Sequence, residues 1–318
     1  MIIPVSAVIA TRNRAESLAR TLDSLLVQGV MPAEFIVVDA SKDDLTKNVM
    51  TKFAGRADPP LTVHWLQTHI AGAASQRNEG VAHVTQPFAW FFDDDVLFDP
   101  DCVRRLWSAI ESDRQLGGVN AMIINQRYQS PGFISRAMFT LMHGRREKSF
   151  AGKLIGPAIN LLPEDRDDLP EVVPVEWLNT TCTIYRREAL PDPAFDSFFT
   201  GYSLMEDVTL SLRVTRAGWK LANVRDASIY HDSQAGSHKN DTAAQAEMEL
   251  INRYYVMTRV ARRTEVANFL KLILFEVFGI VSSVRSEKSI KRLYQTLRGK
   301  QKAVSKLLHG RGSDRTQA

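Results

Sequence analysis

Three consecutive aspartates, Asp93, Asp94 and Asp95, directly follow the apolar run FAWFF (88–92). Carboxylates this close together repel one another unless a cation shares their site or water solvates them. Hard divalent cations such as Mg²⁺ and Mn²⁺ prefer one or two carboxylates together with phosphate oxygens and water. The cluster is therefore a candidate metal–diphosphate site, and a solvated turn that caps the next helix is the alternative.

Two further motifs carry residues that suit a nucleotide. Asp39 ends the apolar run EFIVVD, where it either caps the next helix or accepts a hydrogen bond from a ribose hydroxyl or a base N–H. In GAASQRNEG, small residues precede Arg77, which fits a phosphate-binding helix start or an ordinary solvated arginine. Neither motif decides between its two interpretations by itself.

Acids and a histidine in the second half of the chain complete the candidates. Glu206 and Asp207 begin an expected helix, where the helix dipole stabilises acids and where a carboxylate at a pocket edge can act as a general base. His231 ends an expected strand, either as a polar terminus or as a neutral metal ligand.

Alternating elements must position these side chains. Strands are expected at 5–10, 34–39, 61–66, 88–92 and 118–125, with amphipathic helices between them. This alternation predicts a mostly parallel sheet with helices on both faces, and such sheets bind ligands outside the carboxyl ends of their strands. The residues after three strands, Thr11–Asn13, Asp39 and Asp93–Asp95, should therefore meet at one edge. Asn13 and Glu16 predict a capping box for the first helix.

The composition is that of an ordinary soluble globular protein. The 318 residues are 44% hydrophobic and 24% charged. Two cysteines, Cys102 and Cys182, exclude a disulfide framework and a cysteine-rich zinc site. No basic segment followed by an apolar run opens the chain, so a cytoplasmic location is expected.

The C-terminal region combines an apolar block with a basic tail. The longest apolar stretch, 269–284, contains Lys271 and Glu276 and falls short of a bilayer span. From Arg285 onward, ten Lys or Arg residues face only two acids. This pattern predicts either a helical subdomain with a solvated exterior or peripheral association of 269–318 with an anionic membrane surface. Nucleic acid is not expected, because no recognition module accompanies the charge.

Taken in order, the motifs resemble the family 2 glycosyltransferases, bacterial-type inverting enzymes with the GT-A fold. The matching stretches are VIATRNRAESLARTLDSLL, FIVVDAS, GAASQRNEGVA, FFDDDV, WLNTTCTIYRREAL and EDVTLSLRVTRAGWKL, which lie within residues 3–231. The resemblance implies a GT-A, Rossmann-like, mostly parallel mixed sheet flanked by helices. It predicts a nucleotide-sugar-binding catalytic domain over 1–240 and a C-terminal amphipathic basic helical region over 241–318.

The resemblance also implies a role for each motif. Catalysis falls to Asp207, as the base, and to Glu206 on the acceptor side. Nucleotide binding falls to Thr11, Asn13, Arg14, Asp39, Arg77, Asp93 and Asp94, metal binding to Asp95 and His231, and the acceptor side to Trp177, Asn179 and Thr180. Thr180 stands where the family often has glycine, and VVDAS offers one acid where the family often has two.

The implied reaction is transfer of a sugar, with inversion, from a nucleoside diphosphate sugar to an acceptor hydroxyl, with Mn²⁺ or Mg²⁺ as cofactor. The implied acceptor is a glycan or lipid-linked glycan in polysaccharide or cell-envelope biosynthesis, at the inner face of the plasma membrane. Two alternatives stay open. The chain is a catalytically degenerate nucleotide-sugar-binding scaffold, or a haloacid dehalogenase-type phosphotransferase in which Asp93 is the nucleophile.

Overall fold

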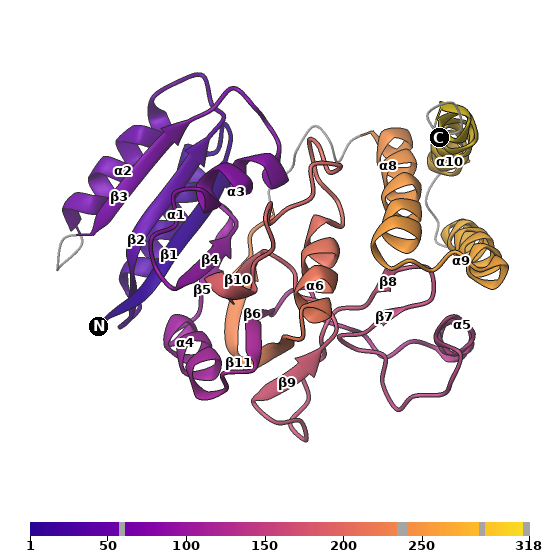
Figure 1. The fold of residues 1–318 in the computed structure, drawn as a ribbon, viewed down its shortest axis with the longest axis horizontal. Coiled ribbons are helices and arrows are strands. Elements are labelled where there is room, and N and C mark those ends of the chain that lie inside the picture. Colours follow the sequence, from indigo (N-terminus) through magenta and orange to yellow (C-terminus); the bar gives the residue numbers. More distant parts are fainter. Residues whose placement is uncertain (57–60, 234–240, 286–289, 314–318) are drawn as a thin grey trace. The chain divides into compact units, whose positions relative to one another are not determined.

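The computed structural model describes residues 1–56, 61–233, 241–285 and 290–313 (Figure 1). The chain forms two compact units, and the second draws on more than the C-terminal region. The first comprises Met1–Gln129, Ala151–Lys153 and Asn160–Gln234, and the second comprises Ser130–Phe150, Leu154–Ile159 and Ala235–Ala318. The division at residue 240 stays a prediction.

A nine-stranded mixed sheet forms the centre of the first unit. Its order is β3-β2-β1-β4-β10-β6-β11-β5, and β9 pairs with β11. Strands β1 to β4, β6 and β11 run in one direction, because the pairs β1–β2, β2–β3, β1–β4 and β6–β11 are parallel and β10 is antiparallel to both β4 and β6. The strands are β1 (Ile2–Thr11), β2 (Met31–Asp39), β3 (Thr62–Gln67), β4 (Phe88–Phe92), β5 (Val96–Phe98), β6 (Leu116–Ile123), β9 (Val172–Val175), β10 (Cys182–Arg186) and β11 (Lys220–His231).

Helices cover both faces of this sheet, as predicted. The main core lies between one face and three helices, α1 (Ala15–Leu26), α2 (Leu45–Arg56) and α4 (Cys102–Ser112). Helix α3 (Ala73–Val81) packs on the opposite face so closely that a Cβ at Gly80 would meet Val8 Cγ1 at 2.4 Å. Helix α6 (Glu206–Arg216) follows a short 3-10 turn, Arg187–Ala189, and a loop.

The predicted capping box at the first helix is wrong. Arg14 is the N-cap residue of α1, and no side chain caps the helix. Asn13 instead has a positive φ of 54°, a conformation that asparagine tolerates better than most residues. Its backbone N–H donates to Ser41 Oγ at 2.7 Å, so the loop after β1 is held by the loop after β2.

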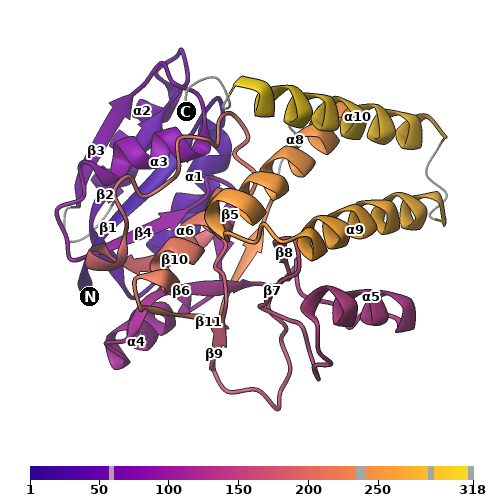
Figure 2. The same ribbon diagram turned by 45° about the vertical axis from the view of Figure 1, so that its right-hand side comes forward.

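The second unit is helical. Its helices are α5 (Phe133–His143), α8 (Thr242–Tyr255), α9 (Val266–Arg285) and α10 (Ile290–Ser313), with a π-helical turn at Val256–Val260 (Figure 2). Leu250, Met257, Leu272 and Ala303 form its small core. The short strands β7 (Leu154–Ile155) and β8 (Ile159–Asn160) pair with each other. Within the described residues, none of the helices is long and apolar enough to cross a bilayer.

Candidate active site

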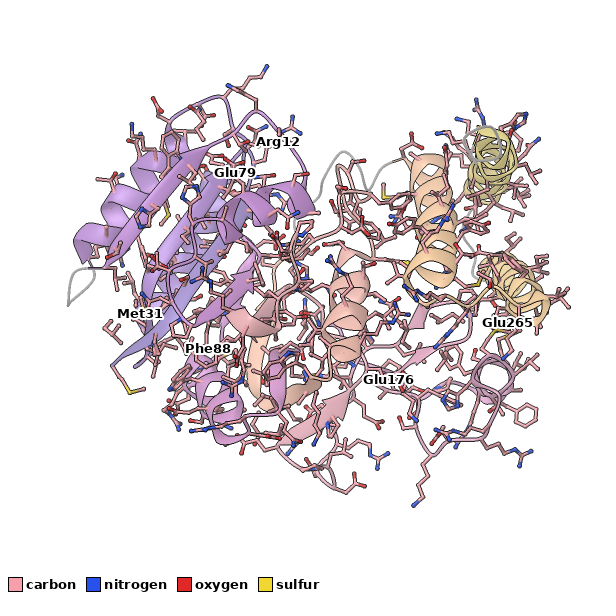
Figure 3. The ribbon with its side chains drawn as sticks, in the orientation of Figure 1. Arg12, Met31, Glu79, Phe88, Glu176 and Glu265 are labelled. Atoms are coloured by element: carbon pink, nitrogen blue, oxygen red, sulfur yellow. The ribbon has the colours of Figure 1, made fainter. Side chains whose placement is uncertain are left out.

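The carboxyl ends of the parallel strands gather the predicted side chains at one edge of the sheet. Thr11 and Asp39 are register partners at the ends of β1 and β2. Figure 3 shows Met31 and Phe88, the first residues of β2 and β4, far from Arg12, which follows β1. The loops that follow these parallel strands therefore lie at the edge where ligands of such sheets bind.

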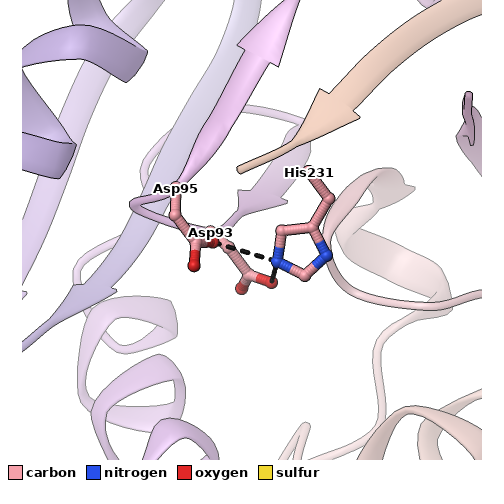
Figure 4. Close-up of side chains that lie close together, drawn as sticks. All are labelled: Asp93, Asp95 and His231. Atoms are coloured by element: carbon pink, nitrogen blue, oxygen red, sulfur yellow. Dashed lines mark hydrogen bonds and ion pairs between the residues drawn. The ribbon is translucent and has the colours of Figure 1, made fainter. Parts of the chain in front are cut away.

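Asp93, Asp95 and His231 form one compact group (Figure 4). His231 Nε2 lies 3.0 Å from Asp95 Oδ1 and 4.0 Å from Asp93 Oδ2. The pairing of β11 with β5 creates this contact, because it places His231 opposite Val96, the residue after Asp95. Three potential ligand atoms, one from each side chain, lie within 4.8 Å of one another.

Asp94 bonds to residues outside this group. It accepts a hydrogen bond from Thr11 Oγ1 at 2.6 Å and another from Arg14 at 3.1 Å. The same Arg14 nitrogen lies 3.1 Å from Asp95 Oδ2. Burial raises the pKa of Asp94 to about 6, against the lowering effect of the bonds from Thr11 and Arg14. Asp94 therefore ties the end of β1 to the aspartate turn.

Arg77 links the aspartate turn to α6. Its guanidinium donates to Asp93 Oδ1 at 2.7 Å and to Glu206 Oε1 at 3.0 Å, and its side chain is only 6% exposed. The ring of Phe195 lies 5.6 Å from the guanidinium carbon. One buried cation thus positions two carboxylates that are far apart in the sequence.

Asp39 is fully buried at the end of β2. Its carboxylate accepts from the backbone N–H of Ser41 at 2.8 Å and from Trp65 Nε1 at 3.3 Å. Asn13 lies beside this loop through its bond to Ser41. Asn13 and Asp39, two of the residues predicted to bind the nucleotide, are therefore linked through Ser41.

The two acids that open α6 have raised pKa values. Burial, with the neighbouring Asp207 charge, raises the pKa of Glu206 to about 8, and Arg77 opposes that rise. Burial also raises the pKa of Asp207 to about 6, although its Oδ1 accepts from the Val208 N–H at 2.7 Å. A carboxyl with a pKa near 6 suits a general base that works around neutral pH.

The stretch that contains the predicted acceptor residues runs beside Asp93, whose backbone N–H donates to Thr181 O at 3.2 Å. Trp177 is buried and donates from Nε1 to Leu161 O at 2.9 Å. Asn179 and Thr180 are also buried, and Asn179 Oδ1 has no hydrogen-bond partner within the described part of the chain.

Sequence reasoning missed several residues that hold the site together. Gln76 donates from Nε2 to Thr11 O and to Val38 O, both at 2.8 Å, and so joins the ends of β1 and β2. Gln126 Nε2 lies 3.1 Å from His231 Nδ1 and orients that ring. Gln76 directly precedes Arg77 in GAASQRNEG, but no local pattern distinguishes it.

The donor set of the Asp93–Asp95–His231 group fits a divalent cation. Two carboxylates and an imidazole supply hard oxygen ligands and one nitrogen, which Mn²⁺ accepts. Five carboxylates, those of Asp93, Asp94, Asp95, Glu206 and Asp207, share this region with the two guanidinium groups of Arg14 and Arg77. The excess negative charge favours binding of a cation.

The chain also matches a known family of proteins. Residues 6–190 match the family Glycosyl transferase family 2. One relative is the Uncharacterized glycosyltransferase YwdF of Bacillus subtilis (strain 168), 31% identical over 108 residues. That match covers 34% of this chain and spans only 38% of the relative's length.

Solved structures share the fold. The mannosyltransferase PcManGT from Pyrobaculum calidifontis, in complex with GDP-Man and Mn²⁺, aligns with a TM-score of 0.54 at 14% identity, over 95% of this chain and 80% of that one. S. aureus TarS 1-349, in complex with UDP-GlcNAc, aligns with a TM-score of 0.57 at 16% identity, over 93% and 79%. The GT-A fold prediction is confirmed. The chain belongs to glycosyl transferase family 2.

Proposed function

We propose that the chain transfers a sugar, with inversion, from a nucleoside diphosphate sugar to an acceptor hydroxyl. The observation that carries this proposal is the chain of contacts from His231 and Asp95 through Asp93 and Arg77 to Glu206, with Asp207 next to it. It joins a candidate cation site to a candidate general base within one connected group. Neighbouring folds are solved with GDP-Man and with UDP-GlcNAc, and this supports a nucleotide-sugar donor.

In the proposed step, Asp207 takes the proton of the acceptor hydroxyl as its oxygen attacks the anomeric carbon. The new glycosidic C–O bond forms on the face opposite the bond that breaks. The electron pair of the breaking bond leaves with the nucleoside diphosphate, so the configuration inverts. The raised pKa of Asp207 supports its role as the proton acceptor.

Asp95 and His231, with Asp93, would hold a divalent cation, Mn²⁺ or Mg²⁺. When bound, such a cation supplies Lewis-acid stabilisation of negative charge on the departing diphosphate. Arg14 and Arg77 bring positive charge to the same edge of the sheet. In the proposal, Thr11, Asn13, Asp39 and Asp94 shape the nucleotide site.

The acceptor-side residues and the cellular role complete the proposal. Asn179 Oδ1 is buried without a hydrogen-bond partner among the residues that the structure describes, which supports a role for Asn179 in accepting a hydrogen bond from a substrate hydroxyl. Trp177 and Thr180 belong to the same stretch. The proposed acceptor is a glycan or lipid-linked glycan in polysaccharide or cell-envelope biosynthesis, at the cytoplasmic face of the membrane.

Calorimetric titration tests the proposal. UDP, GDP and dTDP are titrated into the purified chain with Mn²⁺ and with EDTA, alongside Asp95→Asn. Asp167→Asn is the matched control, because Asp167 is an exposed aspartate that is not among the predicted site residues. We expect one nucleotide to bind in a metal-dependent manner, and this binding to be lost in Asp95→Asn only. Equal binding with and without metal would remove Asp95 from its role.

Turnover then separates an enzyme from a scaffold. The family match leaves the phosphotransferase alternative without support. A degenerate scaffold would bind nucleotide but would release no nucleoside diphosphate from any donor sugar. An Asp207→Asn variant of an enzyme would keep nucleotide binding and lose turnover.

A further inference from the structure

Helix α9 (Val266–Arg285) carries its apolar residues on the outside. Its exposed apolar stripe consists of Val266, Leu270, Ile273, Leu274, Val277 and Val281, whose side chains are between 40% and 74% exposed. Their spacing places them on one helical face. The stripe runs for about 22 Å at 1.5 Å per residue.

Two charged residues of α9, Lys271 and Glu276, lie on its inner side instead. Lys271 Nζ donates to Met142 O at 2.9 Å. Glu276 lies 2.8 Å from Lys300 Nζ and 3.5 Å from Arg253 Nε, and its side chain is 15% exposed. A helix of a water-facing surface has the reverse arrangement. The stripe is therefore built for an apolar environment.

The neighbouring helices extend this surface. Figure 2 shows α9 between α5 and α10, all three helices of the second unit. On α5, Phe133 is 88% exposed and Ile134 58%, and the helix is followed by the exposed Arg145 and Arg146. The second unit thus exposes apolar side chains on more than one helix.

Helix α10 adds an apolar stripe and a strong positive charge. Ile290 is 87% exposed and Tyr294 64%. The helix contains no acidic residue between its first and last positions. Lys291, Arg298 and Lys302 are exposed on it, and no ion pair within the described chain reaches them. Basic side chains beside an apolar stripe characterise helices that lie in a lipid–water interface.

We propose that this surface docks on an anionic lipid bilayer. The apolar stripe of α9 and the start of α5 enter the boundary between headgroups and acyl chains, and the basic residues of α10 contact the anionic headgroups. Charge decides between a bilayer and a second copy of the chain, because two copies would bring their like-charged α10 helices together, whereas an anionic surface neutralises them. The inference concerns attachment alone and does not depend on the proposed reaction.

Flotation with lipid vesicles tests the inference on the full chain. Vesicles of phosphatidylcholine alone are compared with vesicles that also contain phosphatidylglycerol. The stripe variant is Leu270→Gln with Ile273→Gln and Val277→Gln, and the matched control is Val27→Gln with Leu45→Gln and Ile70→Gln. The control residues are 80%, 59% and 63% exposed and belong to the first unit.

We expect the wild-type chain and the control to bind the anionic vesicles. The partitioning of the stripe variant onto anionic vesicles should be at least a hundredfold weaker, because the three replaced side chains no longer bury apolar surface in the bilayer. A charge variant, Lys291→Gln with Arg298→Gln and Lys302→Gln, should lose about a hundredfold on anionic vesicles and little on neutral ones, at about fivefold per basic residue. Its binding should also depend less steeply on salt than that of the wild-type chain.

Three results would overturn the inference. The first is that the wild-type chain does not float with anionic vesicles. The second is that the stripe variant floats as well as the control. The third is that sedimentation velocity shows a wild-type dimer and a monomeric stripe variant, while neither the wild-type chain nor any variant floats. Thermal melting checks that the stripe variant is folded, and the single variant Val266→Gln, at a position 74% exposed, replaces it if it is not.

Discussion

Asp207→Asn is the most informative single substitution, because it should lower activity and raise stability together. Asparagine has the same shape and still accepts the hydrogen bond from the Val208 N–H. It has no basic oxygen, so it cannot take the acceptor proton. Loss of a general base costs about 10²–10⁴-fold in turnover. Nucleotide binding should be unchanged, because within the described part of the chain no ion pair joins Asp207 to Arg14 or Arg77, the two cations of the site.

The stability gain follows from the pKa of Asp207. Burial raises that pKa to about 6 in the folded chain, from an ordinary value of 3.8. The folded state therefore disfavours the ionised carboxylate. The stabilisation that the protonated group supplies is complete below about pH 4 and is lost as the pH rises through about 6. A shift of about two units corresponds to about 3 kcal/mol above pH 7, which asparagine would recover.

Thermal melting at two pH values measures this gain. At pH 7.5, Asp207→Asn should melt roughly 6–12 °C above the wild-type chain, at about 2–4 °C per kcal/mol for a domain of this size. At pH 4 the two melting temperatures should coincide. Asp167→Asn is the control at both values. In the same series, kcat/KM of the wild-type enzyme should rise with pH through about 6 as Asp207 loses its proton.

Two results would refute this reasoning. Wild-type turnover in Asp207→Asn would show that another group accepts the proton, with Glu206 the next to test. An equal change in melting temperature at both pH values would show that burial does not disfavour the ionised form of Asp207.

Three further substitutions test the packing, two at close contacts and one at an open position. Arg77→Ala should destabilise the first unit by about 3–5 kcal/mol in a denaturant titration, because it leaves the buried carboxyl group of Glu206 and the half-buried one of Asp93 without their partner; a loss below about 1 kcal/mol would contradict the role of the bridge. Gly299→Ala should destabilise the second unit by about 1–3 kcal/mol, because its Cβ would lie 2.2 Å from a backbone oxygen of α8. Gly279→Ala, where nothing lies within 4 Å, should be neutral or stabilising in the same melt.

The order of strands and helices along the chain was enough to predict the fold class and the positions of several site residues. Alternating elements force parallel strands to end at one edge, so the positions of Thr11, Asp39 and the aspartates after FAWFF were predictable. The acids that open α6 were visible as well, because they precede an amphipathic helix. Each of these features depends on residues that are adjacent in the sequence, and local sequence patterns can therefore predict it.

Long-range packing alone decided which partners each of these side chains contacts. Consecutive aspartates point in different directions, so Asp94 joins Thr11 while Asp93 bonds Arg77, and nothing in the sequence separates them. The contact between Asp95 and His231 depends on the pairing of β5 with β11 across 136 positions. The outward apolar face of α9 was equally hidden, because periodicity identifies an amphipathic helix but not which side its neighbours cover. That choice belongs to the tertiary structure, where the charged side of α9 finds Arg253 and Lys300 and leaves the apolar side exposed.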